Sequence, residues 1–122
     1  TARRIANAGY LNDHIKARGI STPFQMDGVR HVYHQYVVRV EDEFPASRER
    51  LMEYLQAKGV GSAVHYPKAV YQQPFYKDLG YTDVSCPVAE DVSRRVMSLP
   101  VHPALSAEEL QYISETMNSF EA

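Results

Sequence analysis

The ten residues His31-Val-Tyr-His-Gln-Tyr-Val-Val-Arg-Val40 decide the fold, because their side chains alternate over the length of one strand. Every second residue from Val32 to Val40 would face one side of a sheet, and the residues between them would face the other. We therefore predict a strand over residues 31–40, with the neighbouring segments covering its faces.

Four segments around this strand have the spacing of amphipathic helices. The first covers residues 3–18 and stops at Gly19, and the second follows Ser47 and ends at Gly59. A third helix would run from residue 87 to 96, with Ser85 as its cap, and a fourth would begin at Ser106, where Glu109 completes a capping box. The apolar positions that define the first and last helices are Ile5, Ala8, Leu11 and Ile15, and Leu110, Ile113, Met117 and Phe120.

Two further strands are predicted, over residues 60–66 and 97–101, and residues 20–30 and 67–85 are predicted as loops, the second with room for one or two helical turns around residues 75–79. Helices therefore alternate with strands along the chain. This order predicts an α+β fold, in which a small, mostly antiparallel sheet of three to four strands packs with about four helices.

The size and charge of the chain exclude several classes of protein. Its 122 residues are enough for one core, and its formal net charge of -2 comes from scattered acidic and basic residues, so no nucleic-acid partner is predicted. No apolar run is long enough for a membrane span. The single cysteine, Cys86, and the lack of a secretory signal lead us to expect a cytoplasmic protein.

No residue pattern in the chain is typical of a catalytic or metal centre. The five histidines lack the spacing of zinc ligands, since His31 and His34 would lie on opposite faces of a strand. Cys86 lies beside a helix start without any motif of a nucleophile around it. We therefore predict no catalytic residue and no metal ligand here.

Residues 61–76 are the most promising segment for function. A strand would end by presenting the imidazole of His65, the phenol of Tyr66 and the ammonium of Lys68 together, and further Tyr and Gln residues follow. Such groups suit hydrogen bonding and stacking with a polar ligand, and equally an aromatic contact with another domain. We also predict an exposed aromatic surface formed by Tyr33, Tyr66, Tyr71, Phe75 and Tyr76.

Short motifs follow one another along almost the whole chain. They are Arg4-x-x-Asn7-Ala8, Tyr33-His34-Gln35-Tyr36-Val37, Gly59-Val60, His65-Tyr66-Pro67, Gln73-Pro74-x-Tyr76, Cys86-Pro87-Val88-Ala89-Glu90, Ser98-Leu99-Pro100-Val101-His102-Pro103 and Leu105-Ser106-x-x-Glu109. In this order they resemble the C-terminal portion of the DegT/DnrJ/EryC1/StrS sugar aminotransferases.

The resemblance implies a fold type I pyridoxal phosphate enzyme, usually a homodimer, that transfers an amino group, commonly from glutamate, to a keto-sugar attached to a nucleotide. Such enzymes serve amino-sugar and polysaccharide biosynthesis. Residues 1–122 would form the small C-terminal domain, and the large N-terminal domain that binds the cofactor would lie outside this chain. The lysine that binds the cofactor belongs to that large domain, so this chain by itself is expected to be inactive.

The resemblance also implies that the His-Tyr-Pro segment lies at the cleft between the two domains. His65 and Tyr66 would then contact the nucleotide sugar, and Lys68 could meet a phosphate of the nucleotide. The chain departs from a frequent form of the motif at Ala69, where proline often stands, and at Tyr71, where histidine often stands. No role is carried over to those two positions.

A different class of function remains open from the residues alone. The chain could be a free-standing α+β module that binds a small molecule or regulates a partner protein. An upstream region encoding a large domain with the cofactor lysine would distinguish the two hypotheses.

Overall fold

The structure, a computed structural model, describes residues 1–121 and centres on a three-stranded antiparallel sheet. The strands are β1 (Ile20–Ser21), β2 (Tyr36–Val40) and β3 (Val96–Leu99), in the spatial order β1-β2-β3. In the register, β1 pairs Ile20 with Val40, and β2 pairs Tyr36 with Leu99. The predicted α+β class with a small antiparallel sheet is confirmed.

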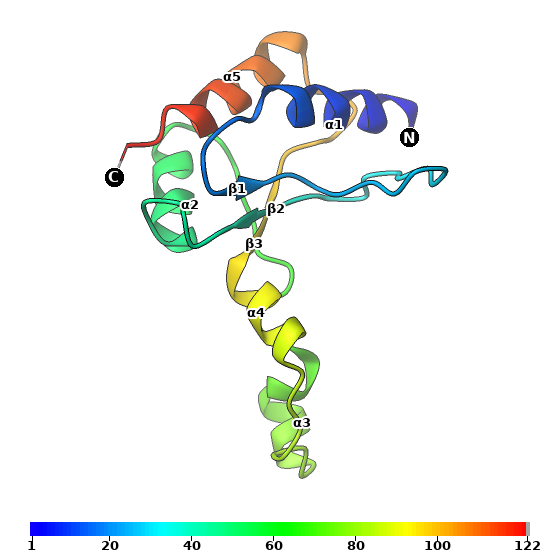
Figure 1. Cartoon of the computed structure of the whole chain (residues 1–122), viewed down its shortest axis with the longest axis vertical. Coiled ribbons are helices and arrows are strands. Elements are labelled where there is room, and N and C mark those ends of the chain that lie inside the picture. The colour runs from blue at the N-terminus through cyan, green and yellow to red at the C-terminus, as the bar shows by residue number, and fades with distance from the viewer. Residues whose placement is uncertain (122) are drawn as a thin grey trace.

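Three helices bury their apolar faces against this sheet and against one another. Helices α1 (Ala2–His14) and α5 (Ala107–Asn118) lie side by side, and α2 (Arg48–Ala57) lies near the C-terminal end of α5, where Tyr54 packs on Phe120 (Figure 1). Ser47 caps α2, and Ser106 with Glu109 forms the predicted capping box of α5. The fully buried side chains of the core include Leu11, Tyr36, Val38, Leu51, Leu55, Met97 and Met117.

Helix α1 ends at His14 rather than at the predicted Arg18, because a side chain of α5 replaces its next hydrogen bonds. The side-chain nitrogen Nδ2 of Asn118 donates to the His14 carbonyl oxygen at 2.8 Å, and the side-chain oxygen Oδ1 of Asn118 accepts from the Lys16 N–H at 2.7 Å. These two bonds fasten the end of α1 to the end of α5. Nothing local in residues 15–18 signals this contact.

The predicted strand over residues 31–40 forms only from Tyr36 onward. Tyr33 has a positive φ of 47°, its N–H donates to Nδ1 of His31 at 3.0 Å, and its ring is buried. The turned backbone lets the Tyr33 hydroxyl donate to Gln25 at 3.1 Å and accept from Asn12 at 3.4 Å. Burial of this ring under α1 overrides the alternation that predicted a longer strand.

Tyr36 provides a test of this buried polar cluster. Burial raises the pKa of Tyr36 well above the ordinary value of 10.0, and its hydroxyl donates to Asn12 at 2.8 Å. Above about pH 10 the unfolded tyrosine loses its proton while the folded one keeps it, so the free energy of unfolding should fall as pH rises, by up to about 1.4 kcal/mol per pH unit. Urea unfolding between about pH 8 and pH 11 measures this slope. Parallel pH curves for the wild-type chain and Tyr36→Phe would contradict the assignment.

The predicted strand over residues 60–66 is wrong, and the short β1 was missed within the predicted loop 20–30. Only one residue of the 60–66 segment pairs with the sheet, through a bridge between Ala63 and Ser98. The Val60 N–H instead donates back to the Leu55 carbonyl at 2.8 Å, which closes α2 after Gly59. The chain then leaves the sheet.

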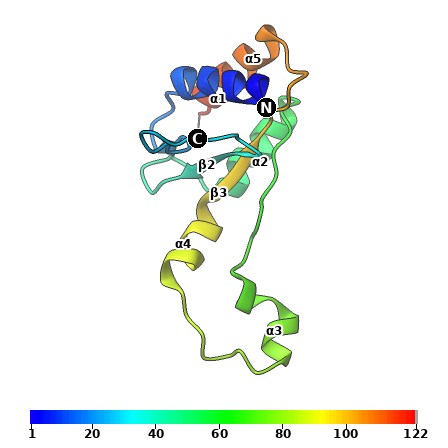
Figure 2. The ribbon, with the colours of Figure 1, turned by 90° about the vertical axis from the view of Figure 1, so that its right-hand side faces the viewer.

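Residues 64–95 form an arm that projects away from the sheet and its helices (Figure 2). The arm contains the short helix η1 (Val70–Gln72), α3 (Pro74–Asp78) at its far end, and α4 (Pro87–Arg95), which leads back to β3. Cys86, not the predicted Ser85, occupies the cap position of α4. Within residues 1–121 no helix combines the length and the apolar character needed to cross a membrane.

Candidate functional site

The arm brings the three predicted site residues to one surface. His65, Tyr66 and Lys68 all line a concave pocket of about 720 Å³, which we call the arm pocket. It lies between the first half of the arm, which leads away from the sheet, and α4. Apolar and aromatic side chains form most of its wall, including Val70, Tyr71, Tyr76, Ala89 and Val92. The Tyr66 ring is 75% exposed and lies perpendicular to the His65 ring, with 6.1 Å between centroids. An open pocket of this kind can take a ring face and a polar group together.

A hydrogen-bonded cluster joins the two halves of the arm, and we call it the polar staple. It consists of Tyr71, Ser85, Cys86 and Glu90. The Tyr71 hydroxyl donates to the Glu90 carboxylate, and the Cys86 N–H donates to the Tyr71 oxygen at 2.8 Å. The hydroxyl of Ser85 donates to the same carboxylate at 3.4 Å. The Tyr71 hydrogen bond lowers the pKa of Glu90, while burial and this carboxylate raise the pKa of Tyr71. The pair therefore holds a charged carboxylate against a neutral phenol at neutral pH.

Loss of the staple should loosen the arm without changing the sheet. In Tyr71→Phe the Cys86 N–H loses its nearer acceptor and keeps the Glu90 carboxylate oxygen at 3.3 Å, so we expect its hydrogen exchange to accelerate by about threefold, less than the loss of a whole hydrogen bond would give. Amides of β2 and β3 should exchange as in the wild-type chain. Tyr81→Phe is the matched control, because Tyr81 lies on the same arm, its ring packs on the Tyr76 ring, and the hydrogen bond from its backbone N–H to the Tyr76 carbonyl survives the substitution. Equal acceleration in both variants would contradict a role for the Tyr71 hydroxyl.

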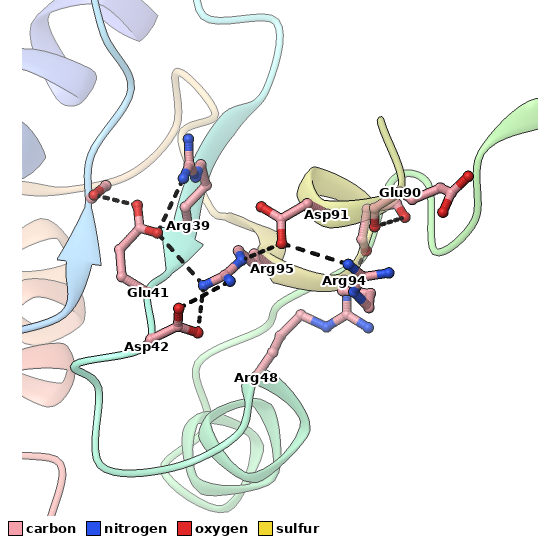
Figure 3. A network of polar contacts seen from close by, with 10 residues as sticks. Arg39, Glu41, Asp42, Arg48, Glu90, Asp91, Arg94 and Arg95 are labelled. Atoms are coloured by element: carbon pink, nitrogen blue, oxygen red, sulfur yellow. Dashed lines mark hydrogen bonds and ion pairs between the residues drawn. The ribbon is translucent and has the colours of Figure 1, made fainter. Parts of the chain in front are cut away.

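Ion pairs fix the return of the arm to the sheet (Figure 3). Arg95, the last residue of α4, donates to both oxygens of Asp42 at 2.8 and 3.1 Å and to Asp91 at 2.8 Å. Asp42 follows β2, so the bidentate contact joins the arm to the sheet. The hydrogen bond from Arg95 lowers the pKa of Asp91.

Arg48 makes a second attachment from the first turn of α2. Its guanidinium donates to the carbonyl oxygens of Ser93 at 2.7 Å and of Val96 at 3.3 Å, at the end of α4. The side chain is only 11% exposed and also pairs with Glu49 at 2.6 Å. Arg48 therefore satisfies carbonyl groups that a helix end leaves without partners.

The predicted exposed aromatic surface exists on the arm, but one of its five members is elsewhere. Phe75 and Tyr66 are well exposed, and Tyr76 is 36% exposed. Tyr71 is half-buried, and Tyr33 is buried in the core. Tyr33 was misplaced because the strand alternation appeared to carry it outward. The remaining four rings belong to residues 64–95.

The described residues, 1–121, offer little for a metal ion or for a cofactor with a reactive aldehyde. Within residues 1–121 no group of three histidine, cysteine or acidic side chains converges as metal ligands would. Lys16, Lys58, Lys68 and Lys77 are all exposed. A lysine that forms a Schiff base with a cofactor typically lies in an apolar pocket or beside another cationic group, whereas these four side chains are open to solvent.

The sequence did not reveal the residues that attach the arm. Arg48 and Arg95 lie in ordinary charged helical segments, where solvent exposure is the usual outcome. Glu90 belongs to the motif Cys86-Pro87-Val88-Ala89-Glu90, which was the only local signal for the staple. Its partner Tyr71 stands where the chain departs from the frequent motif.

Comparisons with known proteins agree with this architecture. The chain is 33% identical over 118 residues to the dTDP-3-amino-3,6-dideoxy-alpha-D-galactopyranose transaminase of Aneurinibacillus thermoaerophilus, covering 97% of this chain and 31% of that protein. It is 35% identical over 101 residues to a pleiotropic regulatory protein of Geobacillus stearothermophilus, covering 83% of this chain and 26% of that protein.

Solved structures superpose closely on almost the whole chain. The crystal structure of Streptomyces venezuelae DesV with a ketimine intermediate matches with a TM-score of 0.84 and 29% identity, over 96% of this chain and 30% of DesV. A DegT DnrJ EryC1 StrS aminotransferase from Brucella abortus matches with a TM-score of 0.80 and 30% identity, over 95% of this chain and 30% of that protein. The chain thus spans between 26% and 31% of the length of these relatives. The DegT/DnrJ/EryC1/StrS aminotransferase family model matches residues 1–118, and the chain belongs to this family.

Proposed function

We propose that this chain is the small C-terminal domain of a pyridoxal phosphate-dependent aminotransferase that acts on a nucleotide sugar. The amino group would pass from glutamate to a keto-sugar in the cytoplasm, for amino-sugar or polysaccharide biosynthesis. The partners of the domain would be its own large N-terminal domain and a second identical subunit. Family membership supports the reaction class, and the relatives include a transaminase of a dTDP-linked sugar.

The observation that carries the proposal for this chain is the shared pocket of His65, Tyr66 and Lys68. The Tyr66 ring can stack on a base or on the apolar face of a sugar. The His65 imidazole can donate and accept hydrogen bonds with sugar hydroxyls, and the Lys68 ammonium can attract a nucleotide phosphate. Together the three groups match the three chemical parts of a nucleotide sugar.

The residues of this chain do not fit the cofactor itself. All four lysines are exposed, so none has the surroundings of a Schiff-base lysine. We therefore assign no step on the cofactor to this chain. Its proposed contribution is to bind and orient the nucleotide sugar.

Replacing His65 with alanine in the complete protein that contains this chain tests the proposal. Loss of one hydrogen bond to the sugar nucleotide should lower the specificity constant of the keto-sugar half-reaction by about tenfold. The glutamate half-reaction should stay within about twofold, since the large domain would hold this small donor. Single-turnover measurements of each half-reaction with a panel of keto-sugar nucleotides separate the two effects.

His14→Ala is the matched control for this experiment. His14 lies at the end of α1, stacked on Tyr10 with 3.8 Å between centroids, and does not line the arm pocket. Its replacement should leave both half-reactions unchanged. Equal losses in both half-reactions of His65→Ala, or no loss in either, would contradict substrate contact by His65.

A further inference from the structure

A second concavity, of about 330 Å³, lies beside the root of the arm and collects basic side chains from four separate segments. Arg4 comes from the first turn of α1, and His34 precedes β2. His65 opens the arm, and His102 follows β3. Residues up to 98 positions apart in the sequence therefore meet at one surface.

The charge of this concavity is one-sided. Among the residues that the structure describes, its lining residues include one arginine and three histidines and no aspartate or glutamate. Most basic residues at protein surfaces lie among acidic ones, and here Arg48 and Arg95 illustrate that pattern with their paired carboxylates. Arg4 makes no ion pair within residues 1–121.

The Arg4 guanidinium is nevertheless held in place. Its Nη1 donates to the His34 carbonyl oxygen at 2.9 Å, and the side chain is half-buried. One N–H group thus fixes the orientation, while the planar fork keeps further N–H groups for another acceptor. A preoriented guanidinium binds a carboxylate or phosphate at a lower entropic cost than a mobile one.

A hydroxyl group in the wall of the concavity lacks a partner. Oγ of Ser98, on β3, is buried and has no hydrogen bond. No other buried side-chain oxygen or nitrogen within residues 1–121 lacks a partner. Unpaired buried polar groups in folded proteins call for a specific explanation. An anion in the concavity does not reach this closed atom, so anion binding would rest on the basic side chains.

From these observations we propose that the concavity lined by Arg4, His34, His65, Ser98 and His102 binds an oxyanion, either a carboxylate or a phosphate group. The existence of the site is independent of the proposed function. The identity of its occupant rests on that function, because a nucleotide sugar carries phosphates and an amino donor carries carboxylates. His65 lines both this concavity and the arm pocket, so the two sites are contiguous.

Titration of the chain with inorganic phosphate, and separately with glutarate, tests the inference at constant pH and ionic strength. The imidazole signals of His34, His65 and His102 should shift in NMR spectra with a common dissociation constant. Those of His14 and His31 are internal controls, because neither lines the concavity. Shifts of all five histidines to the same extent, or of none, would overturn the inference.

A pair of adjacent arginines gives the matched variants. Arg4→Gln should weaken binding by about tenfold, the usual effect of losing a charge-assisted hydrogen bond to an anion. Arg3→Gln removes the same charge one residue away, from an exposed position outside the concavity, and should change the dissociation constant by less than about twofold. Equal weakening by the two variants would show general charge attraction and overturn the site.

Two further readings complete the test. If Arg4→Gln does not fold, His102→Gln replaces it with the same expected direction, since its exposed imidazole lines the concavity while only its backbone carbonyl accepts from Asn7. Binding of phosphate alone identifies a nucleotide phosphate as occupant, and binding of glutarate identifies a donor carboxylate. If neither anion binds while His65→Ala still impairs the keto-sugar half-reaction, the inference fails and the proposed function stands. If the anions bind while His65→Ala leaves both half-reactions unchanged, the anion site stands and the proposed function fails.

Discussion

Gly19→Ala is expected to lower the free energy of unfolding by about 3 to 5 kcal/mol, because both the backbone and the available space require glycine at this position. Gly19 has a φ of 79°, in the left-handed region that other residues enter at a cost. An added Cβ would also lie 2.6 Å from Phe44 Cα and 2.8 Å from the Glu43 carbonyl carbon, and would clash with Phe44 N. These are backbone atoms, which cannot rotate away.

The surroundings of Gly19 leave little room for relaxation. Its carbonyl accepts from the Glu41 N–H at 2.8 Å, directly beyond the pairing of β1 with β2. The Phe44 ring is buried and packs on Phe120 with 5.0 Å between centroids. A shift of residues 43 and 44 would therefore disturb both the sheet edge and the core.

Gly59→Ala is the matched control for Gly19→Ala. Gly59 has nearly the same φ, 77°, but an added Cβ would meet no atom within 4 Å. Only the conformational cost applies, so we expect a loss of about 1 to 2 kcal/mol. Urea unfolding of the three proteins measures both values, and similar losses in the two variants would contradict the steric argument.

Arg48→Met is expected to cost about 2 to 3 kcal/mol of folding free energy and to release the base of the arm. Methionine keeps much of the apolar stem of the side chain but cannot donate to the Ser93 and Val96 carbonyls. Those groups lie at the end of α4, where no helical N–H replaces the lost donor. Unfolding experiments give the stability change, and faster hydrogen exchange confined to α4 would locate it.

Arg50→Met is the control, because Arg50 lies two residues further along the same helix. Its side chain is 70% exposed and, within residues 1–121, forms an ion pair only with Glu53 at 3.3 Å. Exposed pairs of this kind contribute little, so we expect a change below about 0.5 kcal/mol. If Arg50→Met proved as costly as Arg48→Met, the capping role of Arg48 would be wrong.

The helices with strong local signals were predicted well. Ser47 and Ser106 cap α2 and α5 as expected, since a capping side chain bonds to its own first turn and needs no distant partner. The predicted strands were less accurate. The ends of β2 and α1 depend on Tyr33 and Asn118, whose partners are distant in the chain.

The candidate site shows the same division. The types and order of His65, Tyr66 and Lys68 marked their segment for ligand or interface contact alike, and only the family resemblance led to the prediction that they contact substrate. Their common pocket needs α4 opposite them, and α4 is held there by Arg48 and Arg95. The concavity at Arg4 was not predicted at all, because its four basic residues are far apart in the sequence and none is unusual in its own segment.

The sequence by itself thus determined the fold class, the family and the segment that carries the proposed site, because hydrophobic period, caps and short motifs act over a few residues. Only the tertiary structure decided where α1 and β2 stop, how the arm is fastened and which histidines meet. Those outcomes depend on hydrogen bonds and burial between residues that the chain separates by tens of positions, and no local pattern encodes such contacts.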